Sequence, residues 1–113
     1  MKIEGPGKLV QIYIGESDQW HGKALFTAIV ELARKEGLAG ATVTRGIEGF
    51  GANSRIHTTS ILQLSEDLPI KIEIVDTAER VDAFLPLLDE MVTEGLITVQ
   101  DCGILKYADK RTT

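Results

Sequence analysis

The sequence predicts a domain of the α+β class, in which a strand-helix-strand unit occurs twice along 113 residues. Apolar and polar residues alternate with the period of a β-strand in four stretches. Two longer stretches between them carry apolar residues with the period of an α-helix. The ends of the two helical stretches are alike, because the letters KEGL at 35–38 and TEGL at 93–96 lie 58 positions apart. Together these patterns predict the element order βαββαβ.

The first unit occupies the first half of the chain. Residues 8–15 alternate apolar and polar side chains and are expected to form a strand. Residues 22–36 carry one apolar stripe and are expected to form a helix, which Gly37 ends because glycine readily adopts the left-handed backbone. Strand-like alternation returns at 41–50. The stripe of this helix comprises Leu25, Phe26, Ile29, Val30, Leu32 and Ala33.

The second unit repeats this order. Residues 70–76 are the third expected strand, with isoleucine at alternate positions. Asp76 and Glu79 have the spacing of a capping box, so a helix is expected to begin there and to run to about Glu94. Residues 96–107 supply the fourth strand. The inward side of the second helix is expected to comprise Val81, Phe84, Leu85, Leu88, Met91 and Val92.

Two such units form a ferredoxin-like βαββαβ domain, a four-stranded antiparallel sheet with two helices on one face. We expect residues 1–113 to form this one domain, because a chain of this length buries one core. The helices cover only one face of the sheet, and the other face is too apolar for a plain exposed surface. We therefore expect self-association through this face or through the strand edges beside it, with simple exposure as the alternative. This open face carries Leu9, Gln11, Tyr13, Lys71, Glu73 and Val75.

Composition narrows the function. The formal net charge of −5 disfavours a nucleic-acid partner, because such proteins need clustered Lys and Arg to neutralise phosphates. A single cysteine, Cys102, can form no disulfide within the chain, and the first residues lack the apolar core of a signal peptide. No apolar run approaches the ~20 residues that cross a bilayer. A cytoplasmic protein is therefore expected.

The segment 46–58 holds three glycines, Gly46, Gly49 and Gly51, with Arg55 and His57 close behind. The order G-x-x-G-x-G differs from the dinucleotide-binding fingerprint, and no helical pattern follows it. Two readings stay open. The glycines either let backbone N–H groups converge on an anion, or they provide the turns of a long hairpin connection, whose exposed tip is expected at roughly 52–60.

The segment 15–23, GESDQWHGK, joins the first strand to the first helix. Ser17 or Asp18 is expected to cap the helix. Trp20 and His21 offer a stacking surface and a potential cation, or they simply close the edge of the core.

No constellation for catalysis or metal binding is present in the sequence. The chain has two histidines, His21 and His57, which lie far apart, and no pair of cysteines or histidines at metal-ligand spacing. Cys102 falls in an expected strand, where a free thiol usually packs rather than reacts. We therefore expect no catalytic residue and no metal.

Four motifs taken together resemble a known family. The stretches IYIGESD, GLAGATVTRGIEGFG, SRIHT and LPIKIEIVD, in this order, resemble the uncharacterised PII-like proteins, bacterial and archaeal relatives of the PII nitrogen-signalling proteins. The resemblance covers nearly the whole chain. It implies a ferredoxin-like subunit, a homotrimer whose sheets line the centre, and small-molecule sensing in clefts between subunits. It implies signalling and not turnover.

The resemblance also implies which residues bind the ligand. In PII proteins an adenine nucleotide is held by the end of the second strand, the base of the loop that follows and residues around the last strand. Carried onto this chain, these positions are Thr42, Gly49, Phe50 and Gly51. We further infer that Arg55 and His57 supply phosphate contacts, because an arginine fork pairs with phosphate oxygens and a protonated histidine adds charge.

The chain departs from the PII pattern at several points. The stretch between the TV and GFG letters is one residue longer, and Ala52 stands where PII has an arginine. The segment TEGLITVQD lacks the Gly-Asp-Gly-Lys that holds phosphates in PII. The loop after Gly51 is shorter and has no matching tyrosine, so uridylylation is not carried over.

The leading hypothesis is a trimeric sensor of a small anionic ligand such as ATP, ADP or AMP. Ligand binding at the cleft changes the order of the loop at 51–60 and is reported to a regulatory target protein. One rival is a protein-interaction module without a ligand, contacting an enzyme, a membrane transporter or a channel. A second rival is a small cleft enzyme, which requires His21 or His57 beside a buried carboxylate.

Overall fold

The computed structural model describes residues 2–51 and 67–110. Its elements alternate between strands and helices in the predicted order, with one additional strand pair before the first helix. The elements are β1 (Lys2–Gly15), β2 (Gln19–Trp20), β3 (Lys23–Ala24), α1 (Leu25–Lys35), β4 (Thr42–Arg45), β5 (Pro69–Thr77), α3 (Ala78–Met91) and β6 (Leu96–Ala108).

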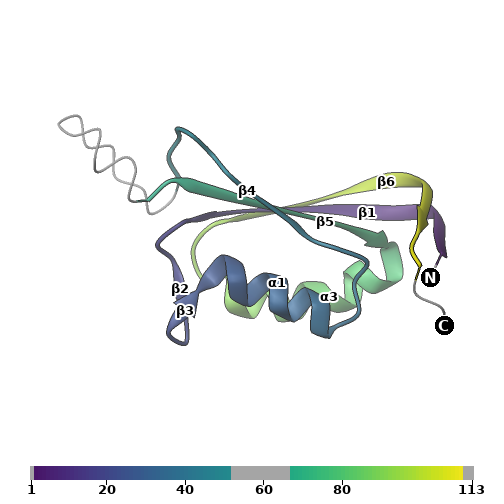
Figure 1. Ribbon diagram of the computed structural model, residues 1–113, viewed down its shortest axis with the longest axis horizontal. Coiled ribbons are helices and arrows are strands. Elements are labelled where there is room, and N and C mark those ends of the chain that lie inside the picture. Colours follow the sequence, from purple (N-terminus) through teal and green to yellow (C-terminus); the bar gives the residue numbers. More distant parts are fainter. Residues whose placement is uncertain (1, 52–66, 111–113) are drawn as a thin grey trace.

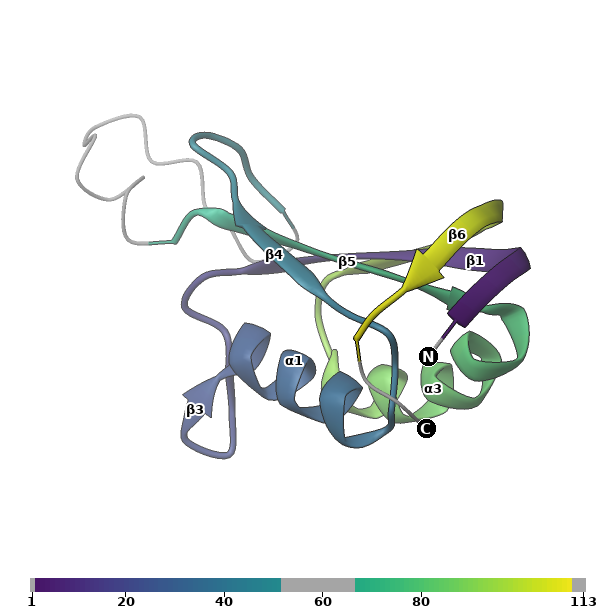
Figure 2. The same cartoon turned by 45° about the vertical axis from the view of Figure 1, so that its right-hand side comes forward.

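The four long strands form one sheet in the order β4-β5-β1-β6, and every neighbouring pair is antiparallel. Figures 1 and 2 show α1 and α3 side by side on one face of this sheet, with the other face uncovered. The ferredoxin-like prediction is confirmed. The two inner strands are the first and third strands of the repeat, so the sheet interlocks the two halves of the chain.

The core lies between the sheet and the helices. Ile12 of β1 and Ile72 of β5 face each other across the strand pair and are fully buried. Burying such a side chain contributes roughly 1.5–3 kcal/mol. From the helices, the predicted residues Ile29, Val81, Phe84 and Leu88 complete this layer.

The open face carries the predicted mixture of side chains. Leu9 lies opposite Val75, Gln11 opposite Glu73 and Tyr13 opposite Lys71. Gln11 Nε2 donates a 3.0 Å hydrogen bond to Glu73, and Lys71 lies 3.9 Å from the same carboxylate. Val75 remains 40% exposed. A polar centre with apolar side chains beside it is thus available for contact with another molecule.

Several element boundaries differ from the prediction. The first strand begins at Lys2 instead of residue 8, because its initial residues pair with the far end of β6 across a bulge near Gly5. The second strand of the repeat covers only Thr42–Arg45, since residues 46–51 leave the sheet. The second helix ends at Met91 and not at Glu94.

The predicted capping box at the start of α3 is wrong. Thr77 is the N-cap, and its hydroxyl accepts from the N–H of Arg80. Asp76 is instead 1% exposed and accepts from two backbone N–H groups, that of Thr77 at 2.6 Å and that of Ala39 at 2.8 Å. Its carboxylate ties the start of α3 to the segment before β4.

The predicted side-chain cap of α1 is also wrong. The helix begins three residues later than expected, after the hairpin of β2 and β3, and its N-cap Ala24 offers no side-chain acceptor. His21 and Gly22 form the turn of this hairpin, both with positive φ, as a type I′ turn requires. Asp18 contributes through its backbone oxygen, which accepts from the N–H of Leu25 at 2.8 Å.

Among the described residues, neither helix combines the length and the apolar character needed to cross a bilayer.

Candidate functional site at the base of the glycine loop

Residues 46–51, which we call the glycine loop, fold back onto the start of β5. The N–H of Gly46 donates to the carbonyl of Pro69 at 2.7 Å. A Cβ added to Gly46 or Gly49 would lie only 2.8 or 3.0 Å from Cγ of Pro69, and Gly49 has a φ of +154°. These two glycines are therefore needed for close packing. Gly51 has no such neighbour and lies in open space.

Phe50 and Gly51 line a pocket of about 160 Å³ at the edge of the sheet. Glu94 and Gly95, in the turn between α3 and β6, also line it. The remaining lining residues come from the end of β1, the segment after it and the start of β5: Tyr13, Ile14, Gly15, Asp18, Pro69, together with Leu96 of β6. The pocket thus joins the base of the glycine loop to the start of the last strand.

Gly95 shapes the far wall of this pocket. Its φ is +150°, and an added Cβ would lie 2.7 Å from the backbone oxygen of Tyr13. Only glycine fits there without displacing the neighbouring strand. The turn after α3 consequently lies directly against β1 and lines the same pocket as Phe50.

The described lining of this pocket carries negative charge. Asp18 and Glu94 are its charged members, and the carboxylate of Asp18 accepts from the N–H of Gly15 at 2.9 Å. The nearby Arg45 is paired with Glu16 at 3.0 Å. No lysine or arginine is among the described residues that line the pocket.

The six ligand residues expected from the sequence are distributed unevenly. Phe50 and Gly51 line the pocket, and Gly49 packs on Pro69 beside it. Thr42 is not in this pocket, because it lies on β4 opposite Glu73, with its side chain exposed. Arg55 and His57 lie outside the described residues, as do the tip at 52–60 and all of the 46–58 segment beyond residue 51.

Eight of the ten lining residues were not expected as site residues from the sequence, and three of them had been given other roles. Tyr13 was assigned only to the open face, Asp18 to a helix cap and Gly95 to a helix end. A glycine follows each helix, at Gly37 and Gly95, and this recurrence is the signal in the sequence that could have pointed to Gly95. Of these two glycines, Gly95 is the one that lines the pocket.

The remaining candidate side chains show no constellation for catalysis. The ring of His21 stacks on Trp20 with centroids 4.2 Å apart and an interplanar angle of 12°. The buried carboxylate of Asp76 binds backbone N–H groups on another side of the fold. Cys102 is a partly buried free thiol in β6. In the described part of the chain no three His, Cys, Asp or Glu residues gather as a metal site would require.

A protein-family model, DUF190 (Uncharacterized ACR, COG1993), matches residues 7–104. The chain belongs to the DUF190 family. A family relative, the UPF0166 protein MJ1524 of Methanocaldococcus jannaschii, is 37% identical over 100 residues, which are 88% of this chain and 92% of the relative.

The fold of this DUF190 protein is shared by solved PII-like structures. A PII-like signalling protein from Thermus thermophilus superposes with a TM-score of 0.62 at 22% identity, covering 89% of this chain and 91% of the other. CPII from Thiomonas intermedia, bound to ADP and bicarbonate, gives a TM-score of 0.54 at 20% identity and 88% coverage of each chain. None of these three proteins is named as an enzyme.

Proposed function

We propose that this DUF190 protein is a PII-like regulatory protein that binds an adenine nucleotide in clefts between the subunits of a homotrimer. Binding is reported to a target protein through the segment that follows β4. The observation that carries the proposal is the pocket that Phe50 and Gly51 line together with Glu94 and Gly95. The ADP bound to CPII, a protein of the same fold, supports the choice of ligand.

The size of the pocket supports a site completed by a second subunit. Its volume of about 160 Å³ is smaller than the roughly 300–1,000 Å³ of most ligand sites. A nucleotide held there would project from the subunit and need a second wall. Thr42 is exposed on the edge strand β4. In the proposed trimer, Thr42 of one subunit contacts the nucleotide held in the pocket of a neighbouring subunit.

The charge of the pocket supports an orientation for the nucleotide. Carboxylates repel phosphates, but they accept hydrogen bonds from an exocyclic amine or a ribose hydroxyl. Asp18 and Glu94 therefore suit the nucleoside, while the phosphates extend out of the pocket. Phe50 is 70% exposed in the subunit, and its ring is available to stack on the base. Arg55 and His57 follow in the sequence and remain our predicted phosphate contacts.

The open face of the sheet is the proposed contact between subunits. It combines the apolar Leu9 and Val75 with the hydrogen-bonded pair Gln11 and Glu73. The hydrogen bond between Gln11 and Glu73 lowers the cost of removing water from these two side chains at a contact.

Calorimetric titration with ADP tests the nucleotide site. We expect Phe50→Ala to weaken ADP binding at least about tenfold, because it removes the stacking ring from the pocket. Ile47→Ala is the matched control, since Ile47 belongs to the same loop, is 96% exposed and does not line the pocket. Equal affinity in the two variants contradicts the proposed site.

The exposed side chains of this loop also favour a second candidate function, a ligand-free interaction module. Ile47 and Phe50 expose apolar surface on the same loop, as protein-contact sites often do. In this case a target protein is captured equally with and without ADP, and Ile47→Asp abolishes capture. For the sensor, addition of ADP changes the amount of target captured.

A further inference from the structure

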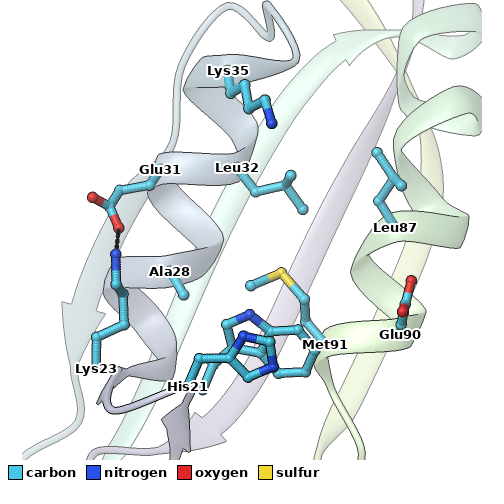
Figure 3. Close-up of a pocket in the computed structure, with 10 residues that line it drawn as sticks. His21, Lys23, Ala28, Glu31, Leu32, Lys35, Leu87, Glu90 and Met91 are labelled. Atoms are coloured by element: carbon cyan, nitrogen blue, oxygen red, sulfur yellow. Dashed lines mark hydrogen bonds and ion pairs between the residues drawn. The ribbon is translucent and has the colours of Figure 1, made fainter.

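A second pocket lies in the groove between α1 and α3. Its volume is about 510 Å³, which is within the usual range of small-molecule sites. The residues that the argument uses are Trp20, His21, Leu32, Lys35, Leu87 and Met91. Figure 3 shows Leu32 and Leu87 on facing walls of this groove, with Met91 between the helices and His21 at one end. It shares no lining residue with the pocket at the loop base.

The end of the groove is a preformed aromatic surface. The rings of Trp20 and His21 are stacked almost parallel, and the type I′ turn of the hairpin fixes their relative position. His21 has a φ of +48°, a conformation that costs free energy for a residue with a side chain. The partly buried Trp20 packs against the core, which anchors the pair at the mouth of the groove. The thioether of Met91 adds a polarisable wall suited to aromatic rings.

The charges along the groove are not equivalent. Lys23 is neutralised by Glu31 at 2.8 Å, on the side of α1 away from α3 (Figure 3). Lys35 extends from α1 toward the space between the helices and makes no ion pair with any described residue. Glu90 stays beside α3. The cation that reaches the groove is therefore available to a ligand.

We propose that this groove binds a small aromatic carboxylate. The ring of the ligand lies at the Trp20–His21 end, its apolar body contacts Leu32 and Leu87, and its carboxylate reaches the ammonium group of Lys35. The ligand thus meets an aromatic surface, an apolar wall and a lysine that makes no ion pair with a described residue. This site is separate from the nucleotide cleft, so a ligand here provides the protein with a second chemical input.

The test uses the fluorescence of Trp20, the single tryptophan of the chain. The native protein is titrated with phenylpropionate, with phenylpropylamine as the cationic molecule of the same skeleton and with acetate as an anion without a ring. We expect a saturable change of Trp20 emission with phenylpropionate, with a Kd of about 1 mM for a molecule of this size. Acetate produces no saturable change, and the amine binds more weakly.

Two charge variants on the last turn of α1 locate the carboxylate. Lys35→Gln is expected to weaken phenylpropionate about three- to fivefold, the range of an exposed charge pair. Arg34→Gln removes the same charge from the neighbouring position, which does not line the groove, and leaves the affinity unchanged. A saturable change with no difference between the two variants overturns the proposal. Absence of saturable binding, or tighter binding of the amine, overturns it as well.

Discussion

Removing the carboxylate of Asp76 is expected to destabilise the fold more than any exposed acidic substitution. Asp76 is 1% exposed, and it accepts from the N–H groups of Thr77 and Ala39. In Asp76→Ala both donors lose their acceptor, and each such loss costs about 1–3 kcal/mol. The free energy of unfolding should therefore fall by at least about 2 kcal/mol. Asp76→Asn keeps one acceptor oxygen and should lose roughly half as much.

Urea unfolding measured by circular dichroism gives these differences from the transition midpoint at constant slope. Asp89→Ala is the control, because Asp89 is exposed on α3, the helix that follows Asp76 in the chain. Its loss should change the free energy of unfolding by less than about 0.5 kcal/mol. If Asp76→Ala differs from this control by less than about 0.5 kcal/mol, the stabilising role of these two hydrogen bonds is wrong. The hydrogen bond to Ala39 bears on function because Ala39 precedes β4, which leads to the loop base.

Three further predictions concern the surface charge, the pocket wall and the open face. The hydrogen bond from Lys8 to Asp82 raises the pKa of the Lys8 ammonium, so Asp82→Asn should lower this pKa in an NMR titration. The stabilisation of the folded state by this hydrogen bond is present at neutral pH and is lost only as the pH rises through the folded-state pKa of Lys8. Gly95→Ala should destabilise the protein by about 1–3 kcal/mol in urea unfolding, whereas Gly103→Ala, with open space around it, should not; equal midpoints contradict the close approach. Val75→Asp should leave the far-ultraviolet spectrum of the subunit unchanged but reduce the oligomer mass in light scattering, and an unchanged mass places the subunit contact elsewhere.

The sheet and both helices could be predicted because the apolar side chains that face the core recur in the sequence with the period of a strand or of a helix. Ile70, Ile72 and Ile74 alternate as a strand requires, and Val81, Phe84 and Leu88 recur with helical spacing. The ends of these elements depend on partners distant in the sequence. The initial residues of β1 include Gly5 and Pro6, which do not suggest a strand, and they are extended because β6 pairs with them.

Side-chain caps were predicted wrongly for a related reason. Asp76 has the spacing to Glu79 that a capping box requires, but its carboxylate is buried and accepts from the backbone N–H of Ala39 instead. The hairpin before α1 was missed because His21 and Gly22 are not the Asn-Gly or Asp-Gly pair that usually signals a type I′ turn.

The candidate site could be predicted only in part. The resemblance to PII-like proteins indicated the loop base, and Phe50 and Gly51 do line a pocket there. Its facing wall at Gly95 follows from the tertiary fold, since the loop base and the last turn are more than forty residues apart in the chain. Thr42 stays a prediction, because within one subunit β4 holds it outside this pocket and its contact with a ligand requires a neighbouring subunit.

Native mass spectrometry in the presence of ADP tests the central claim most directly, because it reports oligomer mass and bound ligand in one spectrum. The proposed function predicts a trimer that gains up to one ADP per subunit, with the adducts reduced in Phe50→Ala. ADP bound to a monomer, or a trimer that acquires no adenine nucleotide when ATP and AMP are also supplied, would contradict a nucleotide site completed between subunits.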